Sequence, residues 1–172
     1  MDKKIKIIIS VLVVSNVLLI SIVAWGFNQM KYVTERVLVV DVADNLFALN
    51  NKITHQSDNE WADPSLVTDE VVNTLEGISL SMNVADTSNT LSEKDLEILW
   101  QLWGVLSGYR PYPMDTFDSY SNISEQNMND FEQLGQVLSE VGIDIKNANE
   151  FGWETESLIE TFEELTVQLQ NK

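Results

Sequence analysis

An unbroken apolar run at residues 7–27 constrains the fold of this chain more than any other feature. Its 21 residues include no charged side chain, and its polar members are Ser10, Ser15, Asn16 and Ser21. A helix of this length measures about 30 Å, which matches the hydrocarbon core of a bilayer. A helix also satisfies its own backbone hydrogen bonds in lipid. The sequence therefore predicts one transmembrane helix at residues 7–27.

The charges around this run predict its orientation. Lys3, Lys4 and Lys6 precede it directly, and clustered lysines favour the cytoplasmic side. Trp25, Phe27 and Tyr32 stand where an aromatic belt at the outer interface is expected. We therefore expect a short basic cytoplasmic tail at residues 1–6 and an extracytoplasmic domain at residues 28–172, held at the cell membrane.

A cleaved secretory signal peptide is the alternative interpretation of the same run. Signal peptides have an apolar region of about 7–15 residues and small residues before the cleavage point. Here the run is longer, and the nearest small-residue site places Ile22 at its −3 position and Trp25 directly after it. These features favour an uncleaved signal anchor.

Composition excludes several classes of function for residues 28–172. This segment holds 26 of the chain's 27 acidic residues and seven of its ten basic ones, a formal charge of −19. Such a segment repels phosphate backbones, so no nucleic-acid binding is expected. The chain has no cysteine, which excludes disulfides, zinc–thiolate sites and thiol catalysis. The 145 residues of this segment are enough to form a hydrophobic core that stabilises a domain without disulfides or metals.

Apolar periodicity predicts that the first helix of the domain continues the membrane helix. One stripe has helical spacing, and a second stripe lies beside it. The first comprises Val39, Val42, Leu46, Leu49 and Ile53, and the second Val33, Val37, Val40 and Phe47. With no proline or glycine between residues 28 and 52, we expect one rod from residue 5 to residue 53, about 73 Å long. Such a rod would couple the domain mechanically to the membrane.

The remaining chain predicts further amphipathic helices separated by polar loops at residues 54–63 and 86–90. Asp63 and Pro64 have the character of an N-cap and a first helical residue. A capping box is offered by Thr90 with Glu93 or by Ser92 with Asp95, and Gly142 is suited to end a helix. We therefore predict an all-α fold, in which a transmembrane helix leads into a bundle of about four to five helices.

Two tryptophans on the expected helix after residue 92 have two interpretations. Trp100 and Trp103 stand at i and i+3 on a segment that is apolar around most of its circumference. They would line a ligand pocket in one interpretation and belong to the core in the other. We expect the core, because aromatic residues on an apolar helix usually pack inside.

The longest irregular stretch, residues 108–122, is the candidate surface for a partner or ligand. Two prolines interrupt it, and long loops that mix aromatic and charged residues are often functional. The candidate residues are Tyr109, Arg110, Tyr112, Phe117 and Tyr120. In the alternative interpretation these aromatics fold back over the end of the bundle. Asn16 is a separate candidate for contact with another membrane helix, because an amide in lipid gains by interhelical hydrogen bonding; self-association through it is left open.

No catalytic motif points to an enzyme. The sequence lacks a nucleophile elbow, a phosphate-binding glycine loop, a dinucleotide fingerprint and an HExxH motif. The single histidine, His55, has no calcium- or zinc-site spacing around it, so no metal or cofactor is predicted. We expect a non-enzymatic interaction module that contacts another envelope or membrane protein. The alternative is an extracytoplasmic ligand-binding or sensing domain that signals through partner subunits.

Overall fold

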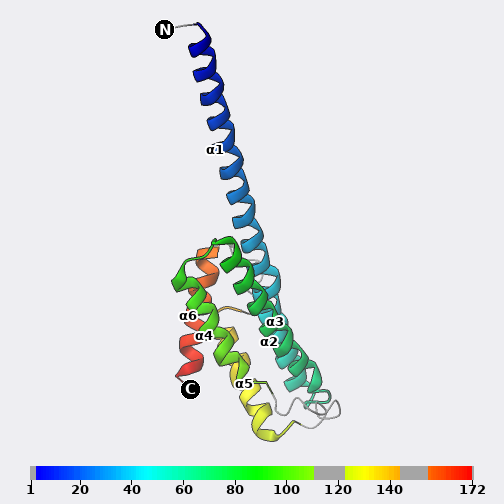
Figure 1. Ribbon diagram of the computed structural model, residues 1–172. Coiled ribbons are helices and arrows are strands. Elements are labelled where there is room, and N and C mark those ends of the chain that lie inside the picture. The colour runs from blue at the N-terminus through cyan, green and yellow to red at the C-terminus, as the bar shows by residue number, and fades with distance from the viewer. Residues whose placement is uncertain (1–2, 111–122, 144–154, 172) are drawn as a thin grey trace. The chain divides into compact units, whose positions relative to one another are not determined.

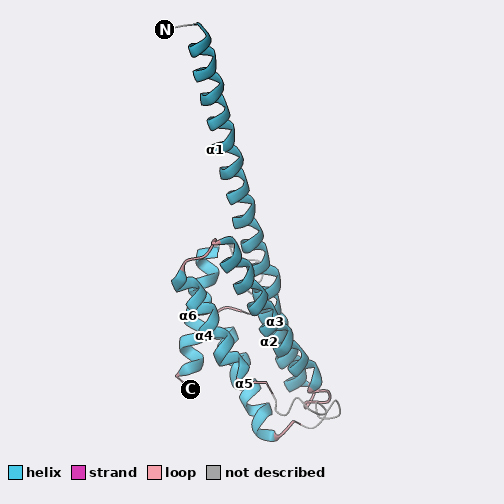
Figure 2. Ribbon diagram, viewed as in Figure 1, coloured by secondary structure: helices cyan, strands magenta, loops and turns pink. Residues whose placement is uncertain are grey.

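The structure, a computed structural model, describes residues 3–110, 123–143 and 155–171, and all of its regular elements are helices (Figures 1 and 2). They are α1 (Lys3–Val37), the π-helical turn η1 (Leu38–Ala43), α2 (Asp44–Asp58), α3 (Ser65–Ser88), α4 (Glu93–Ser107), α5 (Glu125–Glu140) and α6 (Thr155–Gln170). No strand occurs in these ranges. The all-α prediction is confirmed.

The chain divides into two units, Met1–Val33 and Thr34–Lys172. The first unit is an apolar helix whose large hydrophobic side chains are exposed from Ile5 to Val33. By length and composition, it is the one helix in the described ranges that could cross a membrane. This agrees with the predicted span at residues 7–27.

The helical backbone is unbroken from Lys3 to Asp58, but its hydrogen bonding changes at η1. There the Asp44 N–H donates to the Val39 carbonyl, five residues earlier, so the turn holds one residue more than an α-turn. The stripe that the core buries is consequently Leu38, Val42, Leu46, Leu49 and Ile53.

The inserted residue corrects two details of the predicted stripes. Val39 was expected in the buried stripe, yet Leu38 takes the inner position and Val39 only packs partly against the core. Val33 and Val40, expected in a second buried stripe, are 49% and 37% exposed. The stripes were predicted with uniform α-helical spacing, whereas the extra residue in η1 rotates all residues on one side of it relative to those on the other.

The second unit is a closed arrangement of helices around one core. α2 packs between α3 and α5, α4 packs between α3 and α6, and α5 also contacts α6. η1 lies against α3 and α6. The largest fully buried side chains come from every one of these elements and include Leu38, Leu46, Ile78, Leu102, Phe131 and Phe162.

Local capping signals place the start of α4 and the end of α5 where the sequence predicts. Ser92 and Asp95 form the capping box of α4, the second of the two alternatives. Ser124 accepts the Asn127 N–H at 3.2 Å and caps α5. Gly142 has φ 86°, and the Ile143 N–H bonds the Leu138 carbonyl at 2.8 Å, which is a Schellman ending.

The first loop is shorter than predicted. α2 continues through residues 54–58, and α3 begins at Ser65, with Pro64 rather than Asp63 in the capping position. The Asp63 carboxylate instead accepts the Ser65 hydroxyl at 2.5 Å. Buried Gln56 explains the longer helix, because its side-chain oxygen accepts the Asp63 N–H at 2.8 Å and its carbonyl accepts the Trp61 N–H at 2.7 Å.

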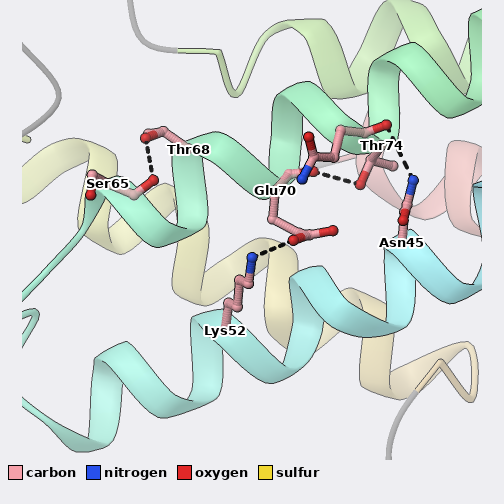
Figure 3. A network of polar contacts seen from close by, with 7 residues as sticks. Asn45, Lys52, Ser65, Thr68, Glu70 and Thr74 are labelled. Atoms are coloured by element: carbon pink, nitrogen blue, oxygen red, sulfur yellow. Dashed lines mark hydrogen bonds and ion pairs between the residues drawn. The ribbon is translucent and has the colours of Figure 1, made fainter.

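A polar network joins α2 to α3 (Figure 3). Glu70 is 5% exposed, and its carboxylate pairs with the Lys52 ammonium. The Thr74 hydroxyl donates to the Glu70 carbonyl at 2.8 Å, and the Asn45 amide donates to the Asn73 carbonyl at 3.2 Å. A buried carboxylate is costly without a partner, and Lys52 of α2 supplies that partner to Glu70 of α3.

A second polar cluster ties the start of this unit to the turn between α3 and α4. The Thr34 side chain is 1% exposed, and its hydroxyl lies 2.6 Å from that of Thr90. The Ser88 hydroxyl lies 2.7 Å from the same Thr90 oxygen. The hydroxyl groups of Thr34, Ser88 and Thr90 thus satisfy one another's hydrogen bonds where water is excluded.

Gly77 lies in direct contact with the backbone of a neighbouring element. A Cβ atom at this position would overlap the carbonyl oxygen of Asp41 and come within 2.7 Å of its carbonyl carbon. Gly77 therefore lets α3 pack directly against η1. This contact accounts for a glycine in the middle of a helix, where it ordinarily costs about 1 kcal/mol relative to alanine.

The tryptophan pair is only partly a core feature. Trp103 is half-buried against the core, whereas Trp100 is 60% exposed, which contradicts its predicted core position. Leu99 and Leu102 occupy the inner face of α4, and one residue beyond Leu99 the helix has turned by about 100° toward solvent. The two indoles meet edge to face, with ring centroids 6.2 Å apart.

Candidate interaction site

The sequence-predicted surface begins at the end of α4. Tyr109 and Arg110 extend this helix end, with N–H groups that bond the Leu106 and Ser107 carbonyls at 3.0 and 3.2 Å. Tyr112, Phe117 and Tyr120, the other three predicted residues, lie outside the described residues. The described part of the site consists of Tyr109 and its neighbours on α4, α5 and α6.

Tyr109 is held by an aromatic stack on Phe131. The two ring centroids are 6.5 Å apart with an interplanar angle of 30°, and Trp61 stacks on the same Phe131 at 6.0 Å. Trp61 is fixed in turn because its indole N–H donates to the Glu132 carboxylate at 3.2 Å. Stacked rings of this kind stabilise a surface beyond the area they bury. Tyr109 thus presents a positioned ring rather than a free side chain.

A groove of about 360 Å³ opens beside this ring. It lies where the end of α4, the first half of α5 and the last turn of α6 come together. Its walls combine aromatic, amide and aliphatic groups with one carboxylate: Val105, Gly108, Tyr109, Asn127, Asp130, Phe131, Gln133 and Leu169.

The electrostatics of the groove favour positive charge. Asp130 supplies the only carboxylate among its lining residues, and no lysine or arginine of the described ranges lines it. Gly108 is the C-cap of α4, and Leu169 belongs to the last turn of α6. Each helix C-terminus carries about half a unit of negative charge. The Asp130 carboxylate and the two helix C-termini therefore both make the electrostatic potential of the groove more negative.

This environment changes the pKa of Tyr109. Burial raises the pKa of its phenol above the ordinary 10.0, and the neighbouring Asp130 carboxylate raises the pKa further. Both effects disfavour the phenolate, the first by desolvation and the second by repulsion between negative charges. Tyr109 is consequently neutral at physiological pH and can donate a hydrogen bond in the groove.

The raised pKa predicts a loss of stability at alkaline pH that depends on Tyr109. A folded-state pKa above the unfolded value gives stability that is complete below pH about 10 and is lost as the pH rises through the folded pKa. We expect the melting temperature of the wild-type domain to fall more between pH 9 and 11 than that of Tyr109→Phe. Circular dichroism melts across this range measure the difference. Parallel declines in the two proteins would contradict the prediction.

Arg110 follows Tyr109 directly but has different surroundings. Its Nε atom is buried and has no hydrogen-bond partner in the described part of the chain. It does not line the groove. The structure thus brings one of the predicted residues, Tyr109, into a defined site and places Arg110 beside it.

Sequence reasoning missed most of the groove. Phe131 is buried in the core, and its ring also forms a wall under Tyr109. Asp130, Asn127 and Gln133 carry no sequence signal that distinguishes them from other polar residues of an amphipathic helix. They become a site only because α5 lies beside the ends of α4 and α6.

Asn16, the candidate contact in the membrane helix, bonds within its own helix. Its side-chain N–H donates to the Leu12 carbonyl at 2.9 Å, and the residue is exposed. A partner helix could still engage the amide oxygen, so the predicted contact stays a prediction.

Two other observations bear on function. A shallower groove of about 470 Å³ is lined by Asp41, Asn45, Asn73, Glu76, Gly77 and Leu80. Among residues 3–110, 123–143 and 155–171, no three His, Asp or Glu side chains gather as a metal site requires.

Comparison with known proteins adds no relative. The chain matches no protein-family model, no curated protein and no solved structure.

Proposed function

We propose that this protein is a single-pass membrane protein whose helical domain is a non-enzymatic interaction module for another membrane or envelope protein. The observation that carries the proposal is a pairing of features in one chain. A helix with its apolar side chains exposed from Ile5 to Val33 precedes a domain that buries its own core. The first unit needs lipid, and the second can remain folded outside it.

The proposed orientation is N-terminus in the cytoplasm and domain outside. Lys3, Lys4 and Lys6 support it through the preference of positive charge for the cytoplasmic side. The formal charge of −19 on residues 28–172 fits a domain that stands off an anionic membrane surface.

Two surface features support an interaction module. Trp100 is 60% exposed on the outward face of α4, and a tryptophan in water is a frequent anchor in protein interfaces. Tyr109, held by its stack on Phe131, offers a second rigid aromatic group. Neither Trp100 nor Trp103 lines the groove beside Tyr109 or the groove between Asp41 and Leu80.

A ligand-binding or sensing domain is the second candidate function. The groove beside Tyr109 favours it, since about 360 Å³ is enough for a small ligand. The two candidates differ in what the groove holds: a side chain of another protein in the first, and a free small molecule in the second.

Protease protection tests the placement. Protease added to spheroplasts should remove the domain and leave an epitope at the N-terminus intact until the membrane is permeabilised. Protection of the domain in intact spheroplasts would contradict the proposed topology, and so would its release into the medium.

Affinity purification from solubilised membranes tests the function. An interaction module should retain a stoichiometric membrane or envelope protein, and Trp100→Ala or Tyr109→Leu should reduce that yield. A chain that purifies alone, with a melting temperature raised by a small molecule, would favour the sensing domain instead.

A further inference from the structure

We infer that the groove beside Tyr109 binds a lysine side chain of the partner protein. This inference rests on the proposed interaction function and names the chemistry of the contact. It starts from the lining of the groove, where one carboxylate, two amides and two aromatic rings meet at two helix C-termini. Each of these groups favours a cation or a hydrogen-bond donor.

The aromatic walls select an organic cation over a simple metal ion. Tyr109 and Phe131 line the groove as a stacked pair, and a ring face attracts an ammonium or guanidinium group placed over it. The aliphatic walls, Val105 and Leu169, suit the methylene stem that carries such a group. Two carboxylates or more would be expected for a divalent cation, and the groove has one.

The geometry of Asp130 selects lysine over arginine. Its Oδ1 already accepts the Gln126 side-chain amide at 2.8 Å. A guanidinium binds best with both carboxylate oxygens at once, and that arrangement would compete with Gln126. An ammonium is a point charge that needs only one carboxylate oxygen. The Gln133 amide oxygen can accept another of its N–H groups, whereas the Asn127 amide oxygen already accepts the Ser124 hydroxyl.

The partner identity follows from charge. Residues 28–172 carry a formal −19, so a basic segment is attracted to this domain before any specific contact forms. General attraction of this kind is diffuse, whereas the groove provides one defined position for a single lysine.

The test uses n-butylammonium as a lysine side-chain probe with the full-length protein in detergent micelles. Incorporation of 3-fluorotyrosine gives a fluorine resonance for Tyr109, identified by its loss in Tyr109→Phe. We expect n-butylammonium to shift this resonance in a saturable manner, while sodium chloride at equal ionic strength and n-butanol do not. We also expect n-butylguanidinium to bind more weakly than the ammonium.

Matched variants decide whether Asp130 carries the binding. Asp130→Asn should weaken the ammonium about fivefold, as expected for loss of a partly solvated charge pair. Glu140→Gln is the control: it removes one charge from the same helix, and Glu140 likewise accepts an i−4 glutamine amide at 2.8 Å. It should change the dissociation constant by less than about twofold. Asp130→Glu, which keeps the charge, should bind within about twofold of wild type and shows that the site tolerates substitution.

Several outcomes would overturn the inference. They are an equal shift with sodium chloride or n-butanol, an equal loss in Asp130→Asn and Glu140→Gln, and tighter binding of the guanidinium. None of these outcomes touches the topology or the copurified partner, so failure here is distinguishable from failure of the proposed function.

Discussion

Replacement of Gly77 by alanine should destabilise the helical domain by about 1–3 kcal/mol, although alanine is the better helix former. The added methyl group would overlap the Asp41 carbonyl of η1. Because this neighbour is backbone, it cannot rotate away as a side chain would, and α3 and η1 must separate. Chemical denaturation of the full-length protein, followed by tryptophan fluorescence, measures the loss.

Gly104→Ala provides the matched control. This glycine lies within α4, and a Cβ atom there would meet nothing within 4 Å. The same substitution should therefore stabilise the domain by about 0.5–1 kcal/mol, since only helix propensity changes. If Gly77→Ala proves as stable as Gly104→Ala, the close contact between α3 and η1 does not exist.

Replacement of Val42 by aspartate should cost about 2–4 kcal/mol and can unfold the domain outright. Val42 is fully buried in the core stripe of η1, where a carboxylate would be removed from water among apolar side chains. The melting temperature by circular dichroism and the susceptibility of residues 31–52 to limited proteolysis both report the change. Resistance of this segment in the wild type is expected if the helix is continuous.

Val40→Asp distinguishes burial from the general effect of a charge in η1. Val40 stands two residues earlier in the same turn but is 37% exposed. A charge there remains hydrated, so the change should stay within about 0.5 kcal/mol. An equal loss of stability in Val42→Asp and Val40→Asp would show that Val40 is as buried as Val42. An unchanged melting temperature in Val42→Asp, with ready cleavage at Lys31 or Arg36, would indicate a linker instead of a helix.

Features set by neighbouring residues could be predicted from the sequence. The capping box at Ser92 and the left-handed ending at Gly142 each depend on side-chain and backbone groups within a few positions. The apolar run before residue 28 is equally local, because its length and lack of charge are visible without any tertiary information.

Features set by contacts between helices could not be predicted from the sequence. The exposure of Trp100 depends on which face of α4 the neighbouring helices cover, and two adjacent leucines fill that face. The groove exists because Asp130 of α5 lies next to the ends of α4 and α6, which are distant in sequence. The shift at η1 inserts a single residue, and a stripe of five apolar positions is compatible with either phase.

The π-helical turn also sets a rule for recombining this protein with others. A chimera that grafts a foreign helix upstream of Thr34 must keep the number of residues between Thr34 and η1, because each residue added or removed there turns the upstream backbone by about 100°. Thr34 would then leave the hydroxyls of Ser88 and Thr90 that it meets at present. Whole heptads can be exchanged with little rotation, whereas single residues cannot. The turn therefore determines which side of a joined helix faces the turn between α3 and α4.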